Sequence, residues 1–201
     1  MMRVFLAGAT GVIGIRLVPL LVGAGHEVAG MTRSHDKSTQ IEALGAQPVI
    51  CDVFDAASLL SAVSDFTPDL VMHQLTDLPD RIDQIPDYAE RNNRIRSEET
   101  RNLLAAAGEA GTRRLLAQSV AWAPPGSSNA VAEHERLVLE AGGVVVRYGQ
   151  LYGPGTYYPD DLPAPPSIHI EDAAGRTMAL LEAPSGIVVL TDEDGIRSLA
   201  P

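Results

Sequence analysis

The chain begins with an apolar strand that runs into an apolar helix through a turn with three spaced glycines. Residues 4–7 read Val-Phe-Leu-Ala, and Gly8, Gly11 and Gly14 follow as the helical pattern of residues 12–22 starts. In such a turn the first glycine permits a sharp bend, the second lets backbone N–H groups approach a ligand, and the third lets the helix pack on the strand. Because the helix N-terminus directs unpaired N–H groups and a positive dipole end at the turn, the pattern predicts a phosphate-binding site.

A glycine triplet of this kind also occurs in strand–helix turns that bind no ligand. Its position favours binding, because the next apolar run, residues 27–32, ends about 20 residues after Gly14, as in folds that bind dinucleotides. We therefore expect the turn to hold the pyrophosphate of a dinucleotide. The residues expected to contact it are Gly8, Thr10, Gly11, Val12, Ile13 and Gly14.

Strand-like and helix-like segments alternate along most of the chain. The expected strands span residues 3–7, 27–32, 48–51, 70–73, 115–119 and 144–147, and the expected helices span 12–22, 37–44, 57–63, 88–110 and 130–140. The strands are too apolar to have a face in water, which is typical of a parallel sheet covered by helices on both faces. The sequence predicts an α/β fold with a doubly wound parallel sheet, the Rossmann fold.

The pattern changes after residue 150. Residues 153–166 are rich in proline and glycine, which predicts a loop. A strand at 167–170, a helix at 173–182 and a strand at 186–190 are expected to follow. We expect residues 1–150 to form a dinucleotide-binding core and residues 151–201 to form a reduced C-terminal substrate region packed on it, within a single domain.

Composition excludes several classes of protein. The 201 residues suffice for one sizeable domain, and the formal net charge of −11 argues against sequence-independent binding to nucleic acid or to an anionic membrane. Cys51 is the only cysteine, so no intrachain disulfide can form. The apolar start of the chain is broken by the glycine turn and is shorter than the ~20 residues of a membrane span. We expect a cytoplasmic protein, and the spacing of the five histidines predicts no metal site.

Short motifs lie in order over almost the whole chain. Besides the glycine turn they are Cys51-Asp52-Val53, Val71-Met72-His73-Gln74-Leu75, Thr100-Arg101-Asn102-Leu103-Leu104, Gln118-Ser119, the segment 147–155 and the segment 168–174. In this order they resemble the extended short-chain dehydrogenases of the NAD(P)-dependent epimerase/dehydratase family. The resemblance implies that Asp52 and Val53 lie by the adenine and that His73 and Gln74 line the middle of the cofactor. A helix cap at Asp52 and a core histidine at position 73 are the alternatives.

The end of the second strand predicts the type of cofactor. An acidic residue there would bind the ribose hydroxyls of NAD, whereas an arginine would pair with the extra phosphate of NADP. Arg33 and Ser34 occupy this place, Lys37 lies at the next helix start, and Asp36 falls later than the usual acidic position. We expect NADP, with NAD as a possible cofactor and a solvated surface arginine as the alternative for Arg33.

The family's usual catalytic pair is absent from the sequence. That pair is Tyr-x-x-x-Lys, but the only lysine is Lys37, and residues 127–140, which would carry the pair, contain no tyrosine. The replacement candidates are Ser119 at the end of the fifth strand and Tyr148 or Tyr152 in the next strand and loop, with His134 weaker. Since an unassisted tyrosine with a pKa of ~10 is a poor base, these tyrosines would need a cation such as Arg147. Aromatic packing is the alternative for both.

Two functions are compatible with these patterns. One is an NADP(H)-dependent oxidoreductase or epimerase-like enzyme acting on a small or sugar-like carbonyl or alcohol. The other is a non-catalytic dinucleotide-binding protein, a redox sensor or an assembly partner that lacks the catalytic pair. The expected partners are a small-molecule substrate or none, and a homodimer is possible.

Overall fold

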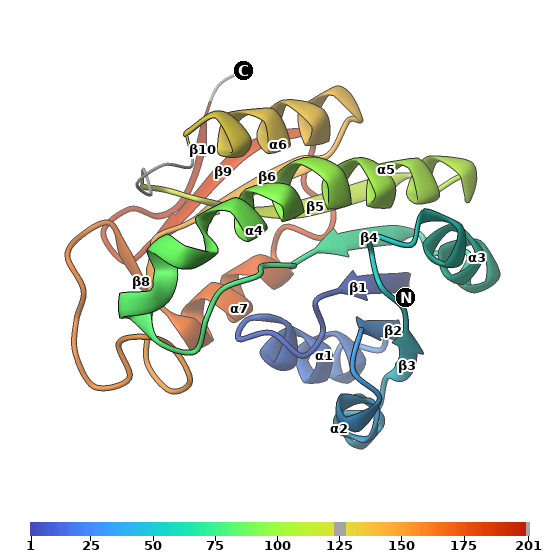
Figure 1. Ribbon diagram of the computed structural model, residues 1–201, viewed down its shortest axis with the longest axis horizontal. Helices are drawn as coiled ribbons and strands as arrows, with labels where there is room; N and C mark the ends of the chain where they lie inside the picture. The colour runs from blue at the N-terminus through green and yellow to red at the C-terminus, as the bar shows by residue number, and fades with distance from the viewer. Residues whose placement is uncertain (123–127, 200–201) are drawn as a thin grey trace.

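The computed structural model describes residues 1–122 and 128–199, which form a sheet of eight strands with helices on both faces (Figure 1). The strand order is β10-β9-β6-β5-β4-β1-β2-β3, and all neighbours are parallel except β10, which is antiparallel to β9. The expected doubly wound Rossmann fold is confirmed. The strands are β1 (Arg3–Ala7), β2 (Glu27–Thr32), β3 (Gln47–Ile50), β4 (Leu70–His73), β5 (Arg114–Val120), β6 (Val144–Tyr148), β9 (Gly186–Thr191) and β10 (Gly195–Leu199).

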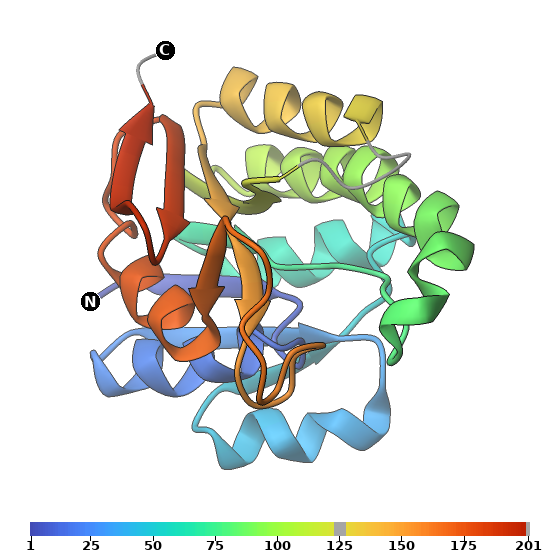
Figure 2. The same ribbon diagram turned by 90° about the vertical axis from the view of Figure 1, so that its left-hand side faces the viewer.

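The helices divide into two layers, one on each face of the sheet (Figure 2). One layer contains α1 (Gly14–Gly23), α2 (Ser38–Ala43), which follows the short turn η1 (His35–Lys37), and α7 (Ile170–Met178). The other contains α3 (Ala56–Phe66), α5 (Thr100–Glu109) and α6 (Ser128–Glu140). Among the described helices, none is long and apolar enough to cross a membrane.

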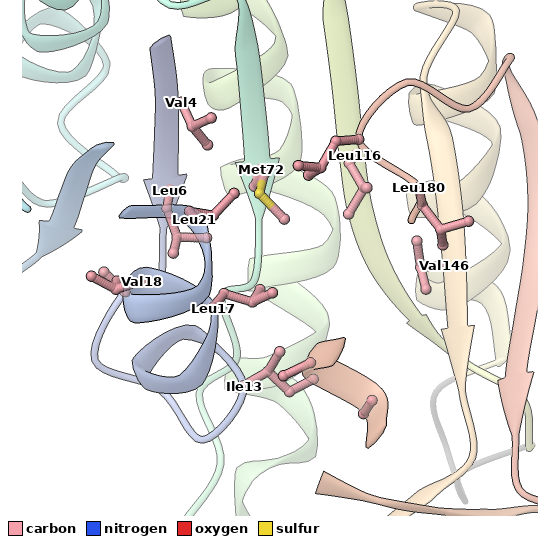
Figure 3. Packing of buried hydrophobic residues seen from close by; sticks show 14 of the residues in the cluster. Val4, Leu6, Ile13, Leu17, Val18, Leu21, Met72, Leu116, Val146 and Leu180 are labelled. Carbon is pink, nitrogen blue, oxygen red and sulfur yellow. The ribbon is translucent and has the colours of Figure 1, made fainter. Parts of the chain in front are cut away.

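The core on the α1 side shows why these sequences fold in this way. Leu17 and Leu21 of α1 are fully buried against Leu6 of β1 and Met72 of β4 (Figure 3). Each such side chain contributes about 1.5–3 kcal/mol through burial. Packing on both faces leaves the ends of the strands as the place where polar side chains and loops gather.

The crossover from β4 to β5 differs from the single helix expected over residues 88–110. The structure divides it into η2 (Ile82–Tyr88), α4 (Ala89–Arg94), a π-helical turn η3 (Ile95–Glu99) and α5. A π-helical turn inserts an extra residue into the helical ladder, and such insertions are frequent at functional sites. Hydrophobic periodicity does not reveal such a turn, because the helix continues on both sides of it.

The C-terminal part contains two short strands, of which the sequence predicted one. β7 (Gln150–Tyr152) and β8 (Ser167–His169) form a separate parallel pair, joined by the expected loop 153–166. β7 was not predicted, because it has only three residues between two glycines. β10 was not predicted either, because it contains few apolar residues. The helix expected from residue 173 starts at Ile170, since Nδ1 of His169 accepts the N–H of Glu171 at 3.3 Å and caps it.

Candidate active site

The glycine turn between β1 and α1 lies tightly against the end of β4. Gly8 has a φ of +91°, and a Cβ there would lie 2.6 Å from the carbonyl oxygen of Gln74. A Cβ at Gly14 would lie 2.1 Å from the carbonyl oxygen of Gly8, so both positions require glycine. Gly11 is exposed at the outer side of the turn, where a Cβ would lie 3.3 Å from the same Gly8 oxygen. The turn is therefore compact inside and open outside.

Backbone donors are available at this open side. In the part of the chain that the structure describes, no acceptor takes a hydrogen bond from the N–H groups of Val12 or Ile13, and no side chain caps α1. A helix N-terminus with free donors is a binding site for anions. The turn thus fits the pyrophosphate of a dinucleotide, with Thr10 and Val12 half-buried beside it.

Arg33, Ser34 and the acidic residue Asp77 lie at the ends of β2 and β4. The Arg33 side chain is 67% exposed and lies 3.8 Å from Oδ1 of Asp77. That carboxylate is already bound by Arg91, whose Nε lies 2.9 Å from Oδ2 and whose Nη2 lies 3.0 Å from Oδ1. Arg33 is therefore held loosely, which leaves its guanidinium available to an added phosphate.

Asp52 and Val53 follow β3 in a loop. Oδ1 of Asp52 accepts the N–H of Phe54 at 3.0 Å, and the Val53 carbonyl accepts a hydrogen bond from Asn102 at 3.0 Å. The cap of α3 is Asp55, because its Oδ1 accepts the N–H of Ser58 at 3.1 Å. Asp52 is thus a turn residue and does not cap α3.

Glu99 is a buried acid that sequence reasoning missed. The side chain is in the π-helical turn, the residue is 2% exposed, and its Oε2 has no hydrogen-bond partner among the described residues. Burial, together with the charges of Asp52 and Asp77, raises the pKa of Glu99 to about 8. No sequence signal marked it, since a glutamate at this helical position normally faces solvent.

Two buried histidines are linked through one threonine. Nε2 of His73 lies 3.1 Å from Oγ1 of Thr100, which lies 2.8 Å from Nδ1 of His134, and Nε2 of His134 lies 2.9 Å from the carbonyl of Gln118. Nδ1 of His73 accepts the N–H of Leu75 at 3.3 Å, so Nε2 of His73 carries the proton. With this arrangement each donor in the series of hydrogen bonds meets an acceptor. Burial lowers the pKa of His134 to about 4 and that of His73 well below its usual value. Both rings are neutral links between strands and helices.

Ser119 belongs to a second network. Its hydroxyl donates to Oε1 of Glu135 at 2.5 Å, and Arg147 donates to both oxygens of the same carboxylate at 2.8 and 2.5 Å. Burial raises the pKa of Glu135, but the hydrogen bonds from Arg147 and Ser119 outweigh it and hold that pKa below its usual value. The hydroxyl proton of Ser119 is therefore used in a hydrogen bond to a carboxylate. The sequence did not predict this hydrogen bond with Glu135.

The tyrosine candidates lie elsewhere. The Tyr148 hydroxyl is 2.7 Å from Oγ1 of Thr177 in α7, on the sheet face opposite α6, and burial raises its pKa to about 12, with Gln74 and Thr177 acting in the other direction. Tyr152 packs edge-on against the ring of His169, with centroids 5.1 Å apart, and a hydrogen bond with Asp192 raises its pKa. Arg147 is bound to Glu135, so it activates neither tyrosine, and catalytic roles for these residues stay predictions.

Residues 153–158, which we call the strap, lie beside the glycine turn. Arg16 of α1 donates to the carbonyls of Val12 at 2.8 Å and Pro154 at 2.6 Å. A Cβ at Gly155 would lie 4.0 Å from Cγ2 of Val12, and the Tyr157 hydroxyl donates to the carbonyl of Pro79. The strap thus joins the turn to the loop after β4.

Known proteins match most of the chain. The family model described as "NAD dependent epimerase/dehydratase family" matches residues 4–140. A 3-diazoavenalumate denitrifying reductase from Streptomyces sp. is 37% identical over 237 aligned residues, covering 96% of this chain and 77% of that protein. Since the aligned stretch is longer than the 201 residues of this chain, the relative has insertions within it.

Solved structures share the fold. The UDP-glucose 4-epimerase of Thermus thermophilus, in complex with NAD, has a TM-score of 0.77 at 18% identity, covering 98% of this chain and 79% of that one. The UDP-Glc/GlcNAc 4-epimerase of Campylobacter jejuni has a TM-score of 0.79 at 12% identity, covering 96% and 79%. With the matched family model and the reductase relative, these findings give one conclusion: the chain belongs to the NAD-dependent epimerase/dehydratase family.

Proposed function

We propose that the protein is a nicotinamide-dinucleotide-dependent reductase of a small electrophilic substrate, with a preference for NADP(H). The observation that carries the proposal is the open glycine turn, where the N–H groups of Val12 and Ile13, at the N-terminus of α1, meet no acceptor in residues 1–122 or 128–199. The similar reductase supports the reaction type, and the loosely held Arg33 supports NADP(H). Gly11 keeps the turn open to the pyrophosphate.

The chain's own residues bind and orient the cofactor, which when bound supplies a hydride. The turn holds the pyrophosphate, Arg33 and Ser34 take the extra phosphate, and Asp52 with Val53 flanks the adenine. His73 ends β4 next to β1, Gln74 follows it, and in this proposal both line the middle of the cofactor. Ser119 then lies toward the reacting end, since β5 is the next strand across the sheet.

Proton transfer decides which substrates suit this site. The Tyr-x-x-x-Lys pair is absent, the Ser119 proton is directed at Glu135, and the pKa of Tyr148 is about 12. Reduction of a ketone needs a proton donor for the developing alkoxide, and loss of such help typically costs 100- to 10,000-fold. Replacement of a diazonium group by hydride needs none: a C–H bond forms, the C–N bond breaks, and its electron pair leaves with dinitrogen.

This chemistry agrees with the relative, whose name describes a denitrifying reductase of a diazo substrate. We therefore infer that a diazonium-like electrophile suits this chain better than an unactivated ketone. Small carbonyl compounds remain the second group of substrates to assay. The rival function is a non-catalytic dinucleotide-binding protein. The observation in its favour is that the Ser119 hydroxyl donates its proton to Glu135 in a hydrogen bond.

The test is a binding titration followed by turnover. NADPH and NADH are titrated into the protein, and oxidation of the preferred cofactor is then followed with benzenediazonium and with benzaldehyde. We expect NADPH to bind more tightly and to be oxidised faster with benzenediazonium than in buffer or with the Gly11→Val variant. Tight binding without turnover on either substrate supports the rival function, and no binding of either dinucleotide refutes both.

A further inference from the structure

Arg96 lies in the π-helical turn η3, which packs against α6. The carbonyl of Ile95 in the same turn accepts a hydrogen bond from Thr100 at 3.4 Å, and Oγ1 of Thr100 lies 3.1 Å from Nε2 of His73 at the end of β4. The residue is half-buried, and its charge acts on His73 and His134, while the charge of Glu135 acts on Arg96. These three residues belong to the two networks of the candidate active site. Arg96 is therefore on the Ser119 side of the site and adds a positive charge there.

The Arg96 guanidinium has no hydrogen bond or ion pair with residues 1–122 or 128–199. The other arginines of the helical stretch from α4 to α5 differ, since Arg91 pairs with Asp77, Arg94 with Glu98 and Arg101 with Glu133. Glu135, whose charge acts on Arg96, is already bound by Arg147 and Ser119. Burying a cation without a partner is costly, and burial lowers the pKa of Arg96.

In the proposed function the glycine turn and Arg33 already supply groups for the phosphates of the cofactor. The phosphate-binding groups lie at the ends of β1 and β2, whereas the groups that Arg96 acts on lie on β4 and α6 and beside β5. In the sheet β4 is a neighbour of β1, and β5 lies on the other side of β4. The turn that carries Arg96 packs on α6, whose Glu135 accepts a hydrogen bond from Ser119 of β5. The guanidinium, which no described residue pairs, is therefore on the β5 side of the site, where the proposed function puts the substrate.

We propose that Arg96 recognises the substrate by binding a carboxylate, so the substrate class is small monocarboxylates with an electrophilic carbon at the Ser119 end. The planar fork of a guanidinium matches a carboxylate with two parallel hydrogen bonds. The neighbouring histidines are neutral and use their ring nitrogens in other hydrogen bonds, so they do not compete with Arg96 for the carboxylate. This assignment rests on the proposed function, because it takes the Ser119 end to be the substrate end.

The test measures carboxylate binding in the cofactor-loaded protein. The probes are acetate, benzoate and trans-cinnamate, each titrated by calorimetry against its neutral amide in the presence of saturating NADP⁺. We expect wild type to bind at least one carboxylate tenfold or more tightly than its amide. Arg96→Gln should remove this preference, and Arg96→Lys should restore part of it, since it keeps the charge and loses the fork.

Arg101→Gln is the matched control, because it removes the same charge from an exposed arginine that already has a partner. It should retain the carboxylate preference of wild type. The assignment is overturned when no carboxylate exceeds its amide in wild type, or when Arg96→Gln keeps the preference. NADP⁺ affinity is measured for every variant: its absence in wild type refutes the proposed function, whereas a lost carboxylate preference with normal NADP⁺ affinity refutes only the role of Arg96.

Discussion

The two halves of the site are built on different principles. Around the glycine turn, the N–H groups of Val12 and Ile13 have no acceptor among the described residues, Arg33 is loosely held and Gly11 is exposed. Around Ser119, by contrast, the buried histidines and the Ser119–Glu135–Arg147 network use nearly all of their hydrogen bonds on one another, and Arg96 carries a charge that no described residue pairs. The comparison teaches that the two halves can change separately, because backbone geometry builds the glycine turn whereas side-chain hydrogen bonds build the surroundings of Ser119.

The largest expected effect concerns the half of the site around Ser119, His73 and His134, which we call the bonded half. His134 has a pKa of about 4 in the folded protein against an ordinary 6.5, so the neutral ring stabilises the fold above pH 6.5. That stability falls as pH decreases from 6.5 to 4, by about 3 kcal/mol for this ring. Urea unfolding across this range should show the loss in wild type, with a smaller loss in His134→Leu. A control, His35→Gln at an exposed histidine, should follow wild type, and equal pH dependence of His134→Leu and wild type would contradict the account.

The next effect concerns the half around the glycine turn and Arg33, which we call the open half. Gly11→Val should lower dinucleotide affinity by about 100-fold, because a branched side chain at the exposed side of the turn occupies the place of the pyrophosphate. Gly108→Val is a matched control, since a Cβ at this helical glycine meets nothing within 4 Å. Calorimetric titration with NADPH measures both. Wild-type affinity in Gly11→Val would show that the turn does not bind the cofactor.

Arg33→Ala should have a selective effect of comparable or smaller size. Losing a charge-assisted contact to the extra phosphate should weaken NADPH binding by about 1.5–3 kcal/mol and leave NADH nearly unchanged. Arg81→Ala, at an exposed arginine paired with Asp83, is the control for net charge. Equal losses for NADPH and NADH would mean that Arg33 does not read the phosphate.

The open half was predictable from the sequence, whereas most of the bonded half was not. Gly8, Gly11 and Gly14 signal a turn because glycine is required there for steric reasons that depend only on neighbouring backbone. Glu135 and Arg147 are 12 residues apart in sequence and meet only because α6 packs on β5 and β6. Glu99 and Arg96 owe their burial to a π-helical turn, which leaves no mark in hydrophobic periodicity.

Transfer of an isotope label tests the central claim. The claim is that a cofactor bound at the glycine turn supplies a hydride to a substrate that needs no proton donor. Wild type is incubated with NADPH carrying deuterium at the transferable position of the nicotinamide and with 4-carboxybenzenediazonium, and the product is analysed by mass spectrometry. We expect benzoate with deuterium at the carbon that carried nitrogen, formed faster than with Gly11→Val. Deuterium incorporation no faster than with Gly11→Val, while NADPH is bound by wild type, would contradict the account.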